Sequence, residues 1–352
     1  MKAKWLSYAV YGAAALMIAV LGAAAMRVLY PSADTYAALS FVEKSVIFLE
    51  VRGSTEDEEG KQIPWIGNGS GFVIWRDAQR VYAMSNDHVV LGAVAIDVRF
   101  MNETRFYQAT VYARDPLYDL VVVVFSSEGR PDDHPPMTIA DSRKVKNLDD
   151  VWTIGNPNQL RFVWAQGRMV SVDLDENYRA MGESFFIADL TVNPGNSGGV
   201  AFDRFGHVMG MVHSISISPH PLAMIIPSRF ISGMTPKLKE GGAIDHGFFD
   251  LGIEDAWTIG TETRKMFGIV SGQDYVVVTH VVEESPAMHA DIRLGDRVLG
   301  IAPSAEAPMT EVRKAREFWE HLQLNFLAGD LVVVRIARNG EIMLKNVTLV
   351  HR

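Results

Sequence analysis

The hydrophobic positions form one long N-terminal run, followed by many short runs separated by turn residues. Residues 5–26 carry no charged side chain, and a run of about 20 apolar residues can cross a bilayer as a helix. Beyond residue 44 the apolar segments are short, beginning with a predicted strand at residues 45–51. Closely spaced short strands with few helical periods predict an all-β sandwich or barrel that continues to Ile226. The clearest further strands are expected at residues 72–75, 81–84, 94–100, 120–125, 151–154 and 208–212.

The N-terminal run predicts that the body of the protein is exported. Lys2 and Lys4 precede the run, so the excess of positive charge on the cytoplasmic side places everything after Arg27 outside the cytoplasm. The small residues Gly22–Met26 offer a cleavage site, so a removed signal peptide is the alternative. Because the run exceeds the usual signal core of about 7–15 residues, we favour an uncleaved transmembrane anchor at residues 1–27.

The stretches between these elements are predicted as linkers and loops. Small residues indicate a linker at residues 28–44, and acidic residues indicate a solvated loop at residues 52–69. Gly67–Gly71 does not predict a dinucleotide site, because a strand rather than a helix follows it. Residues 126–136 are rich in Gly, Pro and Asp and are expected to connect the two halves of the β region.

The C-terminal third predicts a small α+β domain after a second linker at Pro236–Gly247. Ser285 followed by Pro286 is typical of a helix N-terminus. The expected strands are residues 275–280, 331–337 and 342–349, and the expected helices are residues 286–290 and 311–327.

Composition restricts the classes of partner and of site. The 352 residues have room for about two domains. A net charge of −9 argues against a nucleic-acid partner, which requires neutralisation of phosphates. The chain has no cysteine, so disulfides and thiolate metal sites are excluded. We expect no cofactor and no metal.

Ser197 lies in an unusual setting, among Gly195, Gly198 and Gly199. Glycines permit positive φ angles and close approach, so successive N–H groups can converge on one point. A serine nucleophile needs such donors because an oxyanion develops beside it. The alternative is a Gly/Asn/Pro turn that happens to carry a serine.

A base and a carboxylate for this serine are available upstream. His88 follows a predicted strand, and Asp119 leads directly into another. The order His88, Asp119, Ser197 is that of chymotrypsin-type triads. The serine also fits the α/β-hydrolase pattern, with Asp203 and His213 downstream. That pattern requires a helix after the serine, whereas the sequence predicts two short strands there, so we disfavour it.

Six segments together resemble the HtrA/Deg family of trypsin-like serine proteases. They are Gly69–Ile74, Ser85–Val90, Asp119–Val122, Ile154–Pro157, Asn193–Gly199 and Ile226–Ser228. The resemblance implies a mainly β fold, with a chymotrypsin-like pair of perpendicular six-stranded barrels at residues 45–238 and the active site between them. It further implies that His88 is the general base, Asp119 orients it, and Ser197 is the nucleophile. The N–H groups of Gly195 and Ser197 would form the oxyanion hole, with Asn196 between them.

The resemblance also indicates the substrate pocket. Thr191 lies six residues before the nucleophile, where specificity for Lys or Arg would require an acid. A pocket with Thr191 at its floor and Val212, His213 and Ser214 in its wall is expected to accept a small or medium apolar side chain.

The resemblance implies a PDZ domain at residues 249–352, after a linker at residues 239–248. The loop of Asp250, Leu251, Gly252 and Ile253 would bind the carboxylate of a C-terminal peptide added to a sheet edge. Asp250 would repel that carboxylate, and Asp291 replaces a glycine usual in the family. Residues 301–309 also lack the usual Asn-Gly turn.

The remaining expectations concern regulation, assembly and location. Residues 172–184, which include Arg179, occupy the position of the family's regulatory loop, although a charged solvent loop is an equal alternative. One anchor, one protease domain and one PDZ domain resemble the DegS-like arrangement, which implies a homotrimer in the inner membrane with its domains in the periplasm. The implied role is cleavage of unfolded or regulatory proteins in envelope quality control or stress signalling. The alternative is a catalytically idle peptide-binding scaffold or chaperone.

Overall fold

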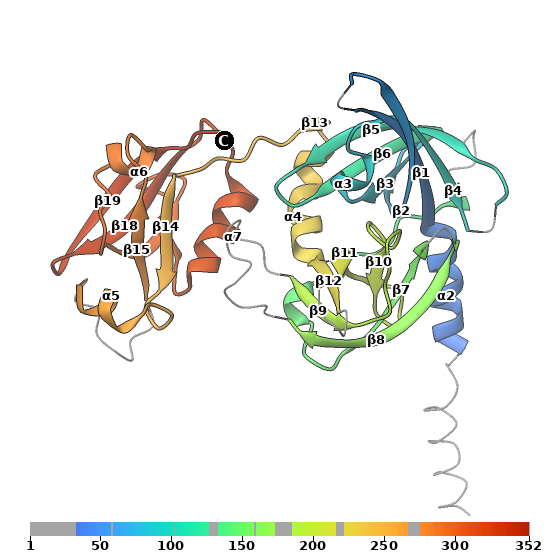
Figure 1. Cartoon of the computed structure of the whole chain (residues 1–352). Helices are drawn as coiled ribbons and strands as arrows, with labels where there is room; N and C mark the ends of the chain where they lie inside the picture. The colour runs from blue at the N-terminus through green and yellow to red at the C-terminus, as the bar shows by residue number, and fades with distance from the viewer. Residues whose placement is uncertain are drawn as a thin grey trace, which may run out of the picture.

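A computed structural model describes residues 33–351 except residues 58, 102, 127–132, 158–159, 173–184, 216–221 and 267–274. The described chain forms two closed β-barrels and a third, separate sheet with its own helices (Figure 1). This confirms the mainly β class and the pair of six-stranded barrels. No described helix is long and apolar enough to span a membrane. The anchor predicted at residues 1–27 lies outside the described residues.

The first barrel has the strand order β5-β4-β1-β2-β3-β6 and is closed by pairing of β5 with β6. Inward-facing side chains from all six strands form its core, including Leu49, Val98 and Val123, which are fully buried. A short strand, β13 (Gly242–Ala243), pairs in parallel with β5. The barrel strands are β1 (Val46–Glu56), β2 (Gln62–Arg76), β3 (Arg80–Ser85), β4 (Ala93–Phe100), β5 (Tyr107–Asp115) and β6 (Leu120–Ser126).

The second barrel closes in the order β10-β11-β12-β9-β8-β7. A large apolar cluster joins it to the first barrel, with Phe72 and Leu120 from one side and Phe202 and Met211 from the other. The junction between the two barrels is therefore a packed interface. The strands are β7 (Asp150–Gly155), β8 (Val163–Ser171), β9 (Phe186–Asp189), β10 (Val200–Phe202), β11 (Val208–Ile215) and β12 (Ala223–Pro227), preceded by the 3₁₀ helix η2 (Ser142–Lys144) and followed by helix α4 (Ser228–Leu238).

The third sheet is antiparallel, with the order β14-β15-β16-β18-β19 and β17 attached to β16. The predicted cap of its short helix is confirmed, because Ser285 Oγ accepts a hydrogen bond from the Met288 amide. Strand β14 lies at the sheet edge, close to helix α7. The elements are β14 (Leu251–Asp255), α5 (Thr261–Met266), β15 (Val276–Val281), α6 (Pro286–His289), β16 (Arg297–Ala302), β17 (Thr310–Glu311), α7 (Ala315–Asn325), β18 (Leu331–Arg338) and β19 (Glu341–Thr348).

Three segments differ from the sequence-based prediction. Where a linker was expected, helix α2 (Ala33–Ser45) forms and buries Val42 against the barrels. Where an acidic loop was expected, β1 and β2 continue as a hairpin that pairs as far as Glu56 with Gln62. Backbone pairing with a neighbouring strand outweighs the polar composition there. Where a linker was expected to begin at Pro236, helix α4 continues to Leu238. Its apolar face packs into the core between the barrels.

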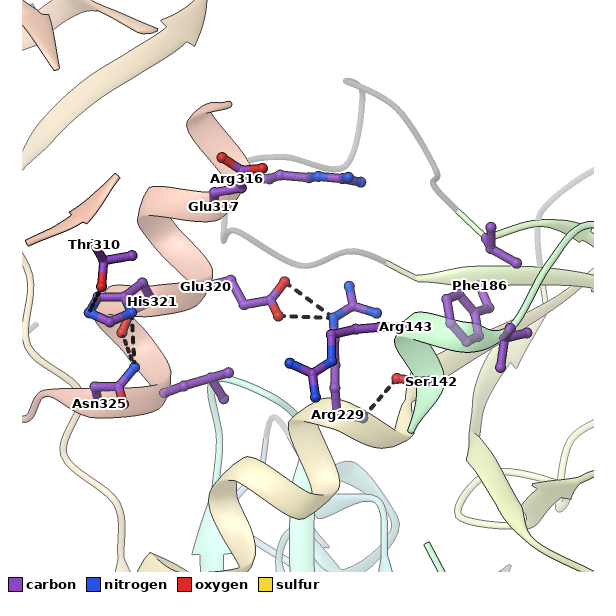
Figure 2. A pocket seen from close by; sticks show the side chains of 13 residues that line it. Ser142, Arg143, Phe186, Arg229, Thr310, Arg316, Glu317, Glu320, His321 and Asn325 are labelled. Atoms are coloured by element: carbon purple, nitrogen blue, oxygen red, sulfur yellow. Dashed lines mark hydrogen bonds and ion pairs between the residues drawn. The ribbon is translucent and has the colours of Figure 1, made fainter. Parts of the chain in front are cut away.

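Helix α7 of the third sheet faces helix α4, which follows the second barrel. A cavity of about 520 Å³ lies between them (Figure 2). Arg229 Nε of α4 lies 3.1 Å from Glu320 Oε1 of α7. Lys237 Nζ donates to the Leu324 carbonyl at 3.1 Å. The hydroxyl of Tyr118, from the first barrel, donates to Gln323 Oε1 at 2.8 Å in a buried position. Helix α7 is therefore attached by polar contacts to both α4 and the first barrel.

A buried pair also fixes the connection between the second barrel and the third sheet. His246 Nε2 lies 2.9 Å from Asp115 Oδ1, and only 2% and 0% of the two side chains are exposed. Replacement of His246 by Ala removes a buried partner of a carboxylate, and we expect it to lower the free energy of unfolding by about 2–3 kcal/mol. Chemical denaturation followed by tryptophan fluorescence measures this change.

The matched control is His351→Ala, because His351 pairs with Asp245 at 3.4 Å on the surface. Exposed pairs contribute little, so this variant is expected to change the free energy of unfolding by less than about 0.5 kcal/mol. Equal effects of the two substitutions would contradict a structural role for the buried pair.

Candidate active site

His88 lies in a short helix, α3 (Asp87–Val90), directly after strand β3. The preceding Asp87 is buried and accepts two hydrogen bonds from Arg114, at 2.9 and 2.6 Å. The Asp87 amide donates to the Asp119 carbonyl at 3.1 Å. These contacts fix the start of the helix and direct the half-exposed His88 ring toward Asp119.

Asp119 is held by its backbone as well as by its side chain. Its φ angle is +52°, a left-handed conformation that Asp tolerates better than most residues. Its carbonyl accepts a second hydrogen bond, from Asn86 Nδ2 at 3.0 Å. Its carboxylate accepts one from the His88 amide at 2.8 Å, and Oδ2 lies 2.7 Å from His88 Nδ1.

The charge of Asp119 follows from these contacts. Burial raises the pKa of the carboxyl, but hydrogen bonds from His213 and His88 outweigh it and lower the pKa to about 2. The carboxylate is therefore ionised at neutral pH. An ionised partner at Nδ1 keeps the proton of neutral His88 on that nitrogen and leaves Nε2 able to accept a proton.

Ser197 lies in a loop between β9 and β10 that is tied to both barrels. The Ser70 amide of the first barrel donates to the Ser197 carbonyl at 2.9 Å, and the Gly198 amide donates to the Val212 carbonyl at 2.9 Å. Gly198 has a φ of +81°, and a Cβ there would lie 2.2 Å from the Ser70 carbonyl oxygen. Only glycine therefore fits between the serine and the first barrel.

The three residues predicted as a triad lie on segments that meet at the junction of the barrels. A Cβ placed on Gly69 would lie 2.5 Å from Val89 Cγ1 of helix α3 and 3.4 Å from the Ser197 carbonyl oxygen. The Ser197 hydroxyl donates to the His213 carbonyl at 3.0 Å, and the His213 ring lies edge-on to His88, with centroids 5.7 Å apart.

Backbone donors are available beside the hydroxyl. The Asn196 amide donates to the Asn193 carbonyl at 3.0 Å, and the Gly195 carbonyl accepts a hydrogen bond from Ser70 Oγ at 2.8 Å. Gly195 has a φ of +103°. Within the described residues, the amides of Gly195 and Ser197 have no hydrogen-bond acceptor. These are the two amides predicted for the oxyanion hole.

The residues predicted for the substrate pocket occupy different environments. Thr191 is exposed, whereas Val212 is buried in the core of the second barrel. His213 Nε2 lies 3.2 Å from Asp119 Oδ2, a contact that sequence reasoning missed. The side chain of Ser214, and all of Arg179, lie outside the described residues.

The predicted carboxylate loop lies at the start of edge strand β14. Asp250 has a φ of +56°, Leu251 and Gly252 are half-buried, and Ile253 is buried in the core of the third sheet. The loop therefore combines one core residue with a backbone that is partly accessible.

The unusual Asp291 also adopts a left-handed conformation, with a φ of +56°. Its carboxylate contacts Lys345 at 2.7 Å, Arg293 at 2.6 Å and Arg338 at 3.1 Å. Hydrogen bonds from these three cations lower its pKa. The cations offer a physical reason why this chain accepts Asp where glycine would suit the backbone.

The two closed barrels define the trypsin-like fold, and the comparisons with known proteins agree. The model of the trypsin-like peptidase domain matches residues 69–211. A "Probable periplasmic serine endoprotease DegP-like" of Marinomonas sp. (strain MWYL1) is 31% identical over 254 residues, which are 68% of this chain and 50% of the relative. "Serine protease Do-like HtrA" of Bacillus subtilis (strain 168) is 27% identical over 311 residues, 84% of this chain and 65% of the relative. The chain thus spans between half and two thirds of the length of these relatives.

Solved structures show the same fold. The HtrA-type protease AlgW with a decapeptide superposes with a TM-score of 0.71 at 21% identity, covering 90% of this chain and 98% of that one. The serine endoprotease from Yersinia pestis superposes with a TM-score of 0.61 at 22% identity, covering 92% and 99%. The sequence matches show that the chain belongs to the HtrA family of trypsin-like serine proteases.

Proposed function

We propose that this protein is a serine endopeptidase that cleaves peptide bonds through an acyl-enzyme, with Ser197 as nucleophile, His88 as general base and Asp119 as its orienting carboxylate. The observation that carries the proposal is the 2.7 Å contact between His88 Nδ1 and an ionised Asp119, next to a serine on a glycine-rich loop. The family relatives are named serine proteases, which supports it.

The proposed proton path gives each of these groups one role. As Ser197 Oγ attacks the scissile carbonyl carbon, His88 Nε2 accepts the hydroxyl proton and later donates it to the leaving amine. Asp119 stabilises the imidazolium formed between these steps. The N–H groups of Gly195 and Ser197 would stabilise the oxyanion. Water then hydrolyses the acyl-enzyme, with His88 again acting as base.

The resting serine requires one rearrangement before attack. Its hydroxyl donates to the His213 carbonyl at 3.0 Å, so this hydrogen bond must break when the proton moves to His88. A substrate or a regulatory signal can supply the free energy, because breaking one such bond costs only about 0.5–1.5 kcal/mol. The pocket beside Thr191 is proposed to accept a small or medium apolar side chain.

We further propose that residues 249–352 are a PDZ domain that regulates the protease. Strand β14 lies at the edge of its sheet near helix α7, and these two elements would form the two sides of a groove for an added peptide strand. Contacts of α7 with the barrels support a coupling between peptide binding and the protease. Glu320 of α7 pairs with Arg229, and Gln323 accepts a hydrogen bond from Tyr118. AlgW, which shares the fold, has been solved with a decapeptide and with a tripeptide.

The proposed setting is the cell envelope. One relative is named a periplasmic endoprotease, and the apolar run at residues 5–26 is suited to a membrane anchor. A homotrimer that cleaves unfolded or regulatory proteins in quality control or stress signalling fits this setting and the family.

The test is covalent labelling of the full-length protein, in detergent, with a fluorophosphonate probe. We expect labelling at Ser197, and faster labelling when a peptide with a hydrophobic C-terminus is added. The same peptide with a C-terminal amide is the control, because it lacks the carboxylate that the loop at Asp250–Ile253 would bind. Absence of labelling in every condition would contradict the proposed protease activity and would favour the catalytically idle scaffold. Equal rates with both peptides would contradict carboxylate-dependent regulation only.

A further inference from the structure

A bulge in the second barrel directs His213 at the catalytic centre. In the pairing of β11 with β12, Val212 lies opposite Ile225 and Ser214 lies opposite Met224, which leaves His213 as the extra residue. Bulges of this kind re-aim a side chain. The His213 ring packs against Phe185, with centroids 5.1 Å apart, and its Nε2 lies 3.2 Å from Asp119 Oδ2.

One carboxylate oxygen of Asp119 therefore has two imidazole neighbours. Oδ2 lies 2.7 Å from His88 Nδ1 and 3.2 Å from His213 Nε2, and all three potential ligand atoms lie within 4.8 Å of one another. Zinc binds imidazole nitrogen and carboxylate oxygen at about 2.0–2.2 Å, which places neighbouring ligand atoms of a tetrahedral site about 3.3 Å apart. The observed spacing thus approaches that of a three-ligand zinc site.

We propose that His88, Asp119 and His213 bind Zn²⁺, and that zinc bound there reversibly inhibits the protease. Two imidazoles and one carboxylate with an open fourth position are a ligand set that suits zinc. The site can be reached from solvent, since the side chains of His88, Asp119 and His213 are 47%, 16% and 27% exposed. Among the described residues, no other group of three His or acidic side chains is arranged in this way.

Inhibition follows from the nitrogen that the metal would occupy. A working triad needs the His88 proton on Nδ1 and a lone pair on Nε2. Zinc at Nδ1 takes that lone pair, so the proton of the neutral ring moves to Nε2, which then cannot accept the Ser197 proton. Zinc on Oδ2 also competes for the carboxylate that orients His88. The inhibitory part of this inference rests on the proposed protease function, whereas metal binding itself does not.

The first experiment measures the effect of ZnCl₂ on the rate of fluorophosphonate labelling of the metal-free, full-length protein. We expect zinc to slow labelling and EDTA to restore it. In His213→Gln, with each rate compared to that variant's own zinc-free rate, the zinc concentration for half-inhibition is expected to rise at least about tenfold, because a ligand is lost. His207→Gln is the matched control, since His207 pairs with a single carboxylate, Asp203, at 3.2 Å. It is expected to retain the sensitivity of the wild type.

The second experiment does not depend on catalysis. Co²⁺ is added to Ser197→Ala protein, and the visible d–d absorption of four-coordinate cobalt is recorded, with Zn²⁺ added afterwards as competitor. We expect bands that disappear with zinc and that are absent from the double variant with His213→Gln, whose fold is checked by circular dichroism. Bands or zinc inhibition that persist unchanged without His213 would overturn the site. If labelling fails altogether while the cobalt bands appear, the protease function fails and the metal site stands.

Discussion

Ser197→Ala is expected to abolish fluorophosphonate labelling and to lower kcat for peptide hydrolysis by about 10⁶-fold, the loss typical of a serine protease without its nucleophile. The hydroxyl is the only group of Ser197 that can form the acyl-enzyme, and its neighbours offer no substitute at the same point. The His213 carbonyl and the Ser70 amide, which contact this residue, are backbone groups that cannot act as nucleophiles. The residual rate would come from substrate binding and the oxyanion donors.

The control is Ser232→Ala, because Ser232 is exposed on α4 and its hydroxyl bonds only locally, to the Arg229 carbonyl at 3.1 Å. Its kcat is expected to match the wild type. The measurement is hydrolysis of an unfolded protein substrate, with active-site titration to correct for inactive enzyme. Hydrolysis by Ser197→Ala at more than about one hundredth of the wild-type rate would place the nucleophile elsewhere.

Asp119→Asn is expected to lower kcat by about 10⁴-fold while leaving the fold intact. The carboxylate accepts from the His88 amide and lies 2.7 Å from His88 Nδ1. An amide NH₂ cannot accept from Nδ1–H, so it favours the tautomer with the proton on Nε2, where His88 is no longer a base. Asp203→Asn is the control, because Asp203 pairs with a histidine away from the triad. A loss of less than about tenfold in Asp119→Asn would contradict the orienting role.

The same substitution tests the charge of Asp119. The pKa is lowered from 3.8 to about 2 in the folded protein, so the ionised carboxylate stabilises the fold above about pH 4, and this stabilisation is lost as the pH falls toward 2. The shift corresponds to about 2 kcal/mol. The difference in unfolding free energy between wild type and Asp119→Asn is therefore expected to change by about 1–2 kcal/mol in favour of the wild type on going from pH 2.5 to pH 6. A pH-independent difference would contradict the lowered pKa.

Local sequence patterns predicted the strands better than the segments between them. The alternating run at residues 94–100 and the apolar run at residues 120–125 correspond to β4 and β6. Helix α2 and the hairpin of β1 with β2 were missed, because their polar or small residues carry no clear period. Those segments gain their structure from packing and strand pairing, which local composition does not record.

In the candidate site, too, the sequence predicted some features and missed another. The sequence shows the glycines around Ser197 and the order of His88 and Asp119 before it. These features are local, because each lies in a single loop or at a single strand end. The contact of His213 with Asp119 depends on a bulge at the pairing of β11 with β12. A bulge shifts a side chain between the two faces of a strand, and short apolar runs do not reveal it.

By itself the sequence determined the mainly β class, the order of a histidine, an aspartate and a serine suited to acyl transfer, and the glycines that let backbone amides converge beside the serine. These features are local, since each depends on residues next to one another in the chain. Only the tertiary structure decided that His213 shares the carboxylate with His88, that His246 is buried against Asp115, and that α7 contacts α4. Such contacts join residues far apart in the chain, and their geometry is set by barrel closure and core packing rather than by any local pattern.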